Sequence, residues 1–398
     1  MKKTWNQHVV KRENKSLILE TIKSQFPISR ADIANLTGLN KGTVSSLVND
    51  LIEEKLIYES GTGKSSGGRR PVMLLFNRLA GYSIGIDLGV NYLLGVLTDL
   101  EGNICYEERV KFNNLSFDEL TEKLFEVIDL LISSTPPSPY GIIGIGIGVP
   151  GTVNKNGDVL LAPNLGWKKV QLREILNDRY KLPIIVENEA NTGAYGEKKF
   201  GVGKKYNNII YVSVGIGIGV GLILNGKLYK GNNGLSGEMG HTTININGEQ
   251  CRCGNIGCWE LYASEKALIN NANSMDIKPA INKELSLESL MVLAENGDEK
   301  TLTLFNQIGD YIGVGINNII NTFNPEQIII GNRMASAQKW LNESIKARIT
   351  NQAMAFHQKD LNLNFSELTT HSSALGAIAF TIEHFIKHEK RESFLEVK

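Results

Sequence analysis

The sequence lacks most features that assign a protein to a specialised class. Its 398 residues carry no net charge at pH 7, so overall charge indicates no particular partner. No apolar run follows Met1-Lys2-Lys3, and we therefore expect no secretory signal. The longest uncharged segment, 209–224, is too short and too rich in glycine for a membrane span of about 20 apolar residues. These absences predict a soluble, cytoplasmic protein, long enough for two or three domains.

Cysteine is also scarce, but its distribution is informative. Three of the four cysteines lie close together, a few residues after His241. In a reducing compartment such a cluster indicates a metal site rather than disulfides. One imidazole, from His241, and the thiolates of Cys251, Cys253 and Cys258 supply the four ligands of a closed, structural Zn²⁺ site. Cys105 stands apart on a predicted strand, where we expect a core residue.

The charges are unevenly placed. Residues 1–80 hold 13 Lys and Arg against seven Asp and Glu, whereas the other 318 residues hold 29 against 35. A basic head on an acidic body is typical of a nucleic-acid-binding module fused to a small-molecule module.

The basic head has the pattern of a helix-turn-helix module. We predict helices at 14–24, at 30–37 after a capping box at Ser29, and at 41–55 after an Asn40 cap. Apolar residues of the third helix follow the i, i+3, i+4, i+7 spacing and face inward: Val44, Leu47, Val48 and Leu51. Polar residues on and beside its other face can reach base edges and phosphates: Asn40, Lys41, Thr43, Ser45, Ser46 and Asn49.

A basic hairpin follows these helices. Strands predicted at 56–60 and 72–76 are joined by a glycine-rich loop, in which Arg69 and Arg70 could enter a minor groove. The alternative is an ordinary helical module whose polar face is merely solvated. We favour the winged helix-turn-helix, because a simple hinge has no need of three basic residues.

The body contains a repeated unit. Residues 82–111 and 209–229 each read as a strand, a glycine turn, a returning strand, a second turn and a third strand. Further elements are expected at 117–134 (helix) and at 142–149, 184–186 and 327–330 (buried strands). This plan predicts a two-lobed α/β body, actin-like and ribonuclease H-like, that binds ligands between its lobes. The glycine loops suit backbone contacts to a phosphate or sugar, although tight β-turns explain them equally well.

Together these residues resemble the ROK family of repressors, open reading frames and kinases, over almost the whole chain. The most specific stretch is Gly-Glu-Met-Gly-His at 237–241, followed by the Cys-x-Cys-Gly-x-x-Gly-Cys-x-Glu run that ends at Glu260. With its head, the chain is similar to the family's xylose repressors. The resemblance implies a sugar site in the cleft, in which His241 binds zinc through one nitrogen and sugar through the other. The implied sugar-binding residues are Asn164, Asn188, Glu189, Glu238, His241 and Glu260.

The phosphate side departs from the family's kinases. Their Asp-x-Gly-Gly-Thr loop reads Asp87-Leu88-Gly89-Val90-Asn91 here, and their Gly-Thr-Gly loop reads Gly215-Ile216-Gly217. A Gly-Gly pair after a later strand is replaced at 331–333 by Gly-Asn-Arg. Glu189 stands where the kinases have a catalytic Asp, and a carboxylate displaced by about 1 Å costs about 10²-fold in rate. We therefore expect a degenerate kinase fold without phosphotransfer.

We expect a DNA-binding domain at 1–76, a first lobe at 77–195 joined by a C-terminal helix at 372–390, and a second lobe at 196–371 with the zinc loop and a dimerisation surface. A homodimer would hold palindromic operator DNA and release it when xylose binds, with glucose as a candidate competitor. Two alternatives stay open. One is an active sugar kinase with a regulatory head, and the other is a sensor of a phosphorylated amino sugar or a phosphoprotein.

Overall fold

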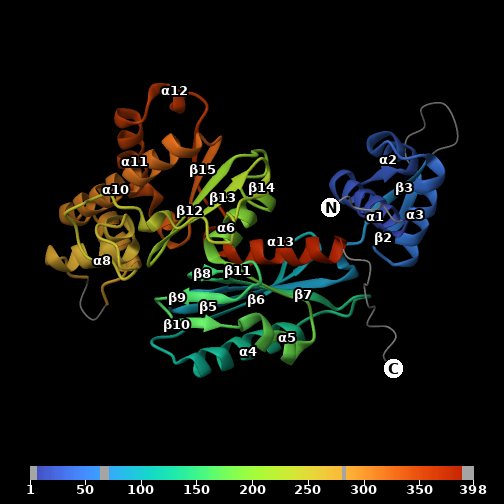
Figure 1. The fold of residues 1–398 in the computed structure, drawn as a ribbon, viewed down its shortest axis with the longest axis horizontal. Helices are drawn as coiled ribbons and strands as arrows, with labels where there is room; N and C mark the ends of the chain where they lie inside the picture. Colours follow the sequence, from blue (N-terminus) through green and yellow to red (C-terminus); the bar gives the residue numbers. More distant parts are fainter. Residues whose placement is uncertain (1–6, 63–70, 280–283, 388–398) are drawn as a thin grey trace.

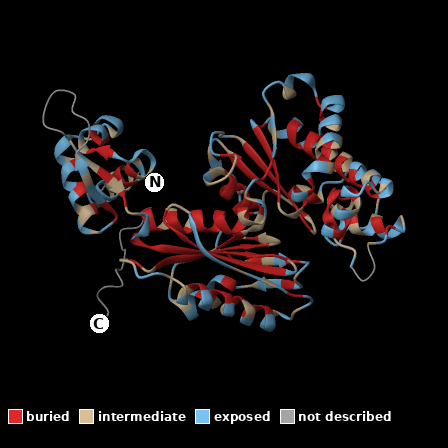
Figure 2. Cartoon of the chain, turned by 180° about the vertical axis from the view of Figure 1, so that it is seen from behind, coloured by how far each residue is buried: buried red, intermediate tan, exposed pale blue. Residues whose placement is uncertain are grey.

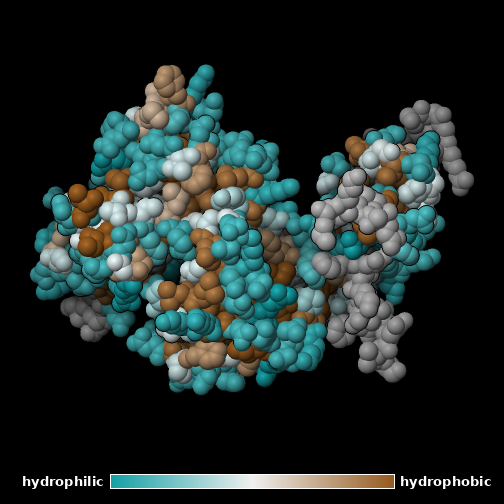
Figure 3. All heavy atoms as spheres, viewed as in Figure 1, coloured by the Kyte–Doolittle hydropathy of each residue, from teal (hydrophilic) through white to brown (hydrophobic). Residues whose placement is uncertain are grey.

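The computed structural model describes residues 7–62, 71–279 and 284–387. An N-terminal head lies beside the C-terminal end of helix α13 (Ser372–Lys387), and a larger body of two α/β lobes makes up the rest (Figure 1). The central strands of the large sheets are buried, whereas the edge strands are partly exposed and the outer helices expose one side (Figure 2). Hydrophilic side chains cover most of the face seen in Figure 3, with apolar ones in smaller groups between them.

The head packs helices against a small antiparallel sheet of strand order β1-β3-β2. Its elements are α1 (Gln7–Gln25), β1 (Ile28–Ser29), α2 (Arg30–Thr37), α3 (Lys41–Glu53), β2 (Ile57–Thr62) and β3 (Val72–Phe76). The Ser29 and Asn40 side chains cap α2 and α3, and Gly38 turns the chain between them with a φ of 72°. The four apolar residues predicted to face inward from α3 are buried.

Two helix boundaries differ from the sequence-based prediction. Helix α1 is already formed at Gln7, the first described residue, and not only from 14, since its exposed turns before Ile18 carry no apolar period that would mark them as helical. Helix α3 ends at Glu53, since Lys55 turns the chain out of the helix with a φ of 57°.

The first lobe is a sheet of strand order β11-β7-β4-β5-β6. Its strands are β4 (Tyr82–Leu88), β5 (Tyr92–Asp99), β6 (Ile104–Lys111), β7 (Ile142–Val149) and β11 (Ile184–Asn188). Helices α4 (Phe117–Ser133) and α5 (Leu172–Tyr180) cover one face, while α13 and α6 (Glu189–Lys199) lie on the other (Figure 1). A small sheet of β8 (Thr152–Val153), β9 (Val159–Ala162) and β10 (Trp167–Val170) borders the cleft.

The second lobe repeats the plan with strand order β14-β13-β12-β15-β16. Its strands are β12 (Ile209–Val214), β13 (Ile218–Leu224), β14 (Lys227–Leu228), β15 (Gln327–Gly331) and β16 (Asn362–Phe365). Its helices are α7 (Glu260–Ala263), α8 (Glu265–Ser274), α9 (Leu287–Glu295), α10 (Glu299–Phe323), α11 (Gln338–Gln352) and α12 (Ala355–Gln358). Each lobe thus begins with consecutive antiparallel strands, β4-β5-β6 and β12-β13-β14, as the repeated unit predicted.

Helix α13 contacts both the interlobe helix α6 and the head. A Cβ on Gly376 would lie 1.7 Å from the Thr192 carbonyl, so only glycine lets α13 approach α6 this closely. At its other end, Ile382 and Ile386 belong to the same buried apolar cluster as Ile18 of α1. The head core and the first lobe are therefore one packed unit.

Cys105 was expected in the core, and this prediction is wrong. Its side chain is exposed, because β6 is the edge strand of its sheet. Within the described ranges, no helix combines the length and apolar character needed to cross a bilayer.

Candidate functional site

A polar cavity lies between the lobes, at the ends of β4, β7, β11, β12 and β15. All six residues implied as sugar contacts line it: Asn164, Asn188, Glu189, Glu238, His241 and Glu260. Residues far apart in the chain and drawn from both lobes therefore converge on one site, as the resemblance implied.

Two glycines position the loop that carries Glu238 and His241. A Cβ on Gly237 would lie 2.1 Å from the Val220 carbonyl, and one on Gly240 would lie 2.1 Å from the Ile218 carbonyl. The loop can therefore lie directly against β13, which brings both side chains into the cavity wall. This close approach is a physical reason for the Gly-Glu-Met-Gly-His pattern.

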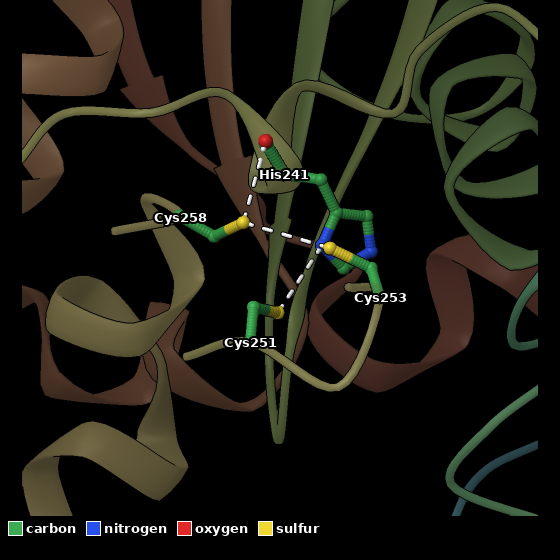
Figure 4. A group of neighbouring side chains, drawn as sticks. All are labelled: His241, Cys251, Cys253 and Cys258. Atoms are coloured by element: carbon green, nitrogen blue, oxygen red, sulfur yellow. Dashed lines mark hydrogen bonds between the residues drawn. The ribbon is translucent and has the colours of Figure 1, made fainter. Parts of the chain in front are cut away.

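The predicted metal ligands form a compact cluster beside the cavity (Figure 4). The donor atoms of His241, Cys251, Cys253 and Cys258 all lie within 4.8 Å of one another. The Cys253 and Cys258 sulfurs are 3.6 Å apart, and the Cys251 sulfur is 3.7 Å from His241 Nδ1. Tetrahedral Zn²⁺ with sulfur and nitrogen ligands requires separations of about 3.5–3.8 Å. These two separations match that range and the other donor pairs lie within 4.8 Å, so the cluster could hold a metal with four ligands.

The remaining carboxylates connect this cluster to the cavity. Glu260 Oε1 lies 3.6 Å from His241 Nδ1 and 3.4 Å from the Cys251 sulfur. A Cβ on Gly217 would meet Glu260 Oε2 at 2.8 Å, so the second glycine loop makes room for this carboxylate. Glu238 is exposed and accepts a hydrogen bond of 3.3 Å from the Thr152 hydroxyl.

Asn188 and Glu189 lie at the start of α6, in different roles. The Asn188 side chain caps the helix through the Ala190 and Asn191 amides, and its Nδ2 donates to the Gly151 carbonyl at 2.7 Å. The polar atoms of the Asn188 side chain are therefore used mainly to hold the cavity wall and not to bind a ligand. Glu189 Oε1 instead accepts hydrogen bonds from the Ser213 hydroxyl (2.8 Å) and from Asn332 Nδ2 (2.7 Å).

The sequence did not point to a buried acid opposite Glu189. Asp87 is buried, accepts a 2.5 Å hydrogen bond from the Tyr92 hydroxyl, and has no partner for Oδ1 among the described residues. Burial raises the pKa of Asp87 to about 6, and burial together with the charge of Asp87 raises the pKa of Glu189 to about 7. An aromatic residue at the start of a strand is usually interpreted as a core residue, so no sequence signal identified Tyr92 as the partner of Asp87.

The residue after Asn332, Arg333, forms ionic contacts beside the cavity. The Arg333 guanidinium donates to both oxygens of Glu265, at 2.8 and 2.9 Å, and to Glu288 at 3.0 Å. This arginine lines the cavity but is already paired, so it does not offer an open site for a phosphate.

The DNA-binding candidates on α3 gather on one exposed side of the head. Lys41, Ser45, Ser46 and Asn49 are exposed, as is the cap Asn40, while Thr43 is half-buried. Asn49 also accepts a 3.2 Å hydrogen bond from Arg30. The predicted wing residues Arg69 and Arg70 lie outside the described residues.

Comparison with known proteins matches residues 83–384 to the ROK family. The chain belongs to the ROK family. A xylose repressor of Bacillus spizizenii is 45% identical over 381 residues, which are 96% of this chain and 98% of that protein.

Two solved ROK structures extend the comparison to the fold. A ROK transcriptional regulator, described as a homologue of the Escherichia coli MLC protein, has a TM-score of 0.81 and 29% identity, covering 95% of this chain and 97% of its own. A ROK glucokinase from Streptomyces griseus, solved with glucose and AMPPNP, has a TM-score of 0.69 and 25% identity, covering 75% of this chain and 99% of its own. These similarities confirm the predicted fold class, an N-terminal module of helices and a small sheet on a sugar-kinase-like α/β body.

Proposed function

We propose that this ROK protein is a sugar-responsive transcriptional repressor of xylose-utilisation genes. The observation that carries the proposal is the convergence of the six sugar-site candidates on one interlobe cavity, in a chain that retains the whole head. Similarity to a xylose repressor over 96% of the chain supports xylose as the effector. Because operator DNA lies in the bacterial cytoplasm, we propose that location as well.

The cavity chemistry suits a neutral sugar. Hydroxyl groups both donate and accept hydrogen bonds, and the cavity offers the carboxylates of Glu238 and Glu260, the amide of Asn164 and a nitrogen of His241. We propose that the cysteine cluster holds a structural Zn²⁺, which would act only by fixing the loop. His241 would then face the ion through Nδ1 and the sugar through Nε2, so that loop order and sugar binding depend on each other.

Several contacts argue against phosphotransfer. The Tyr92 ring packs where a Cβ on Gly89 would lie, only 2.2 Å away, and its hydroxyl is committed to Asp87. Arg333 is held by two glutamates on the nucleotide side, and Glu189 Oε1 is held by two donors. We propose that the fold no longer transfers phosphate. A coupled assay with ATP and glucose or xylose should stay at background, and turnover would instead support the kinase alternative.

We assign residues 1–76 to DNA binding, residues 77–195 with 372–390 to the first lobe, and residues 196–371 to the second lobe and dimerisation. Two heads of a homodimer would meet palindromic half-sites about one helical turn, or a multiple of it, apart. Sugar bound at the start of α6 would favour one arrangement of the lobes. Helix α13, which packs on both α6 and the head, provides the route by which that arrangement reaches α1.

The decisive experiment measures operator binding and sugar binding together. A palindromic operator, selected from random duplexes, is titrated with and without saturating xylose, glucose or N-acetylglucosamine 6-phosphate. Xylose should weaken operator binding by about 5- to 150-fold, the usual range of coupling between two sites. Glucose should compete with xylose for the cavity. Equal operator affinity with and without every sugar would contradict the proposed function, and release by the phosphorylated sugar alone would favour the phosphosugar alternative.

A further inference from the structure

Asn332 has a backbone conformation that asparagine rarely adopts. It follows β15 with φ of 64° and ψ of −162°, a region that is essentially restricted to glycine. Stability alone therefore favours glycine at this position. A side chain retained at the expense of backbone strain indicates that the side chain has a role.

Both polar atoms of the Asn332 side chain form hydrogen bonds, and one of them bonds to Glu189. Its Oδ1 accepts a hydrogen bond from the Arg333 amide at 2.7 Å, which fixes the side-chain orientation. Its Nδ2 donates to Glu189 Oε1 at 2.7 Å and to the Ser213 hydroxyl at 3.0 Å, and that hydroxyl also donates to Glu189 Oε1 at 2.8 Å. Ser213 is buried, while Glu189 and Asn332 are half-buried, so this triangle of side chains lies in the cavity wall.

The triangle restricts what Glu189 can offer to a ligand. Two donors occupy Oε1, whereas no residue in the described part of the chain donates to Oε2. Asn332 and Ser213 come from strands of the second lobe, and Glu189 follows β11 of the first lobe. The carboxylate is thus held from across the cleft with one oxygen left for the cavity that it lines.

We propose that Asn332 is a positioning residue that, with Ser213, aims Glu189 Oε2 at one hydroxyl of the bound sugar. The proposal rests on the proposed sugar-binding function. Asn332 itself need not touch the sugar. Its amide sets the orientation of the Glu189 side chain, and Oε2 then forms a directed hydrogen bond with one ring hydroxyl.

The test substitutes Asn332→Gly in the full chain and compares three quantities with the wild type. These are the melting temperature, the affinity for xylose by calorimetry, and the affinity for each monodeoxy derivative of xylose. Glycine relieves the positive φ but removes the hydrogen bonds of the Asn332 side chain, so the two effects oppose each other and the melting temperature should change little. Xylose affinity should fall about 10- to 100-fold, the size expected when a charged group loses a hydrogen bond that directs it. Ser213→Ala should act in the same direction, and the double variant should lose less than the sum of the two effects.

The deoxy sugars separate positioning from a general structural role. The Glu189→Gln variant identifies the hydroxyl that Glu189 recognises. It is the hydroxyl whose removal from xylose lowers the affinity of the wild type but not that of the variant. Asn332→Gly should reduce the loss of affinity caused by removing that same hydroxyl. The losses caused by removing the other hydroxyls should stay as in the wild type. A uniform loss of affinity across all sugars would overturn the proposal.

Asn324→Gly is the matched control. Asn324 ends α10 with a φ of 42° and is exposed, so Asn324→Gly also replaces an asparagine of positive φ but should leave sugar affinity unchanged. Wild-type xylose affinity and discrimination in Asn332→Gly would refute the positioning role while leaving the proposed function intact. Absence of any sugar binding by the wild type would refute both.

Discussion

The Ser16 hydroxyl of α1 donates a hydrogen bond of 3.1 Å to the Ile386 carbonyl in the last turn of α13. This bond joins the head to a helix whose first turn lies against α6, where Ser373 contacts the Thr192 hydroxyl at 3.0 Å. Nearby, Lys23 Nζ donates to the Leu100 carbonyl at 2.7 Å and the Tyr140 hydroxyl donates to the Glu54 carbonyl at 2.9 Å. The head is therefore attached to the first lobe by directional contacts as well as by apolar packing.

Removing that hydroxyl should weaken communication between sugar and operator. In Ser16→Ala, the ratio of operator affinities without and with xylose should shrink by at most about 2- to 13-fold, because one hydrogen bond contributes about 0.5–1.5 kcal/mol. Xylose affinity in the absence of DNA should change little. Fluorescence anisotropy of labelled operator measures the ratio. Ser24→Ala is the control, since Ser24 donates only to Thr21 within α1. An unchanged ratio in Ser16→Ala would show that this bond carries no coupling.

Loss of one cysteine of the cluster should remove the metal and the sugar response together. Cys253→Ser leaves three donors of a closed site, so metal analysis should fall from about one zinc per chain to near zero. Xylose should then no longer release the operator, because the loop carrying Glu238 and His241 loses its anchor, while operator binding itself persists. Cys105→Ser, on the exposed edge strand, should keep both metal and response. Full metal content in Cys253→Ser would contradict the ligand set.

Much of this architecture could be predicted from local sequence. Apolar runs such as 142–149 and 327–331 are buried on both faces and read as strands directly. The cysteine spacing predicted the metal cluster, because three thiols in one short loop have few other arrangements. The sugar-site residues came from the family resemblance, since their positions in the chain alone do not bring them together.

The features that could not be predicted from the sequence depend on contacts between residues that are far apart in the chain. The Asn332–Glu189 bond joins residues separated by 143 positions, and nothing at either position signals the other. The exposure of Cys105 depends on β6 being the edge of its sheet, which only the strand order reveals. The described turns of α1 before residue 14 have no apolar period, so the helical pattern did not reveal them.

The two buried carboxylates should make the protein less stable as the pH rises. The pKa of Glu189 is raised from its ordinary value to about 7 by burial and by Asp87, so folding favours the protonated form. The resulting stabilisation is present below about pH 4.5 and is lost as the pH rises through 7. Asp87, whose pKa is raised to about 6, acts in the same sense at lower pH.

Glu189→Gln should therefore be more stable than the wild type at pH 8, by about 1–3 kcal/mol, and similar to it near pH 4.5. Urea unfolding across this pH range measures the difference. Glu343→Gln on the exposed side of α11 should leave the wild-type profile unchanged. Parallel pH profiles for the wild type and Glu189→Gln would rule out a strongly raised pKa at this position.

Lys41, at the start of α3, should contribute a phosphate contact to operator binding. Its side chain is exposed at the helix that we propose as the DNA-reading element, where the helix N-terminus also attracts phosphate. Lys41→Ala should weaken binding to every duplex to a similar extent and lower the slope of log affinity against log salt by about 0.9, the value for one neutralised phosphate. Lys266→Ala, exposed on α8 of the second lobe, is the control that keeps the wild-type slope. If Lys41→Ala instead altered the preference among operator sequences without changing the salt slope, the lysine would be reading a base edge, because base contacts discriminate among sequences whereas phosphate contacts do not.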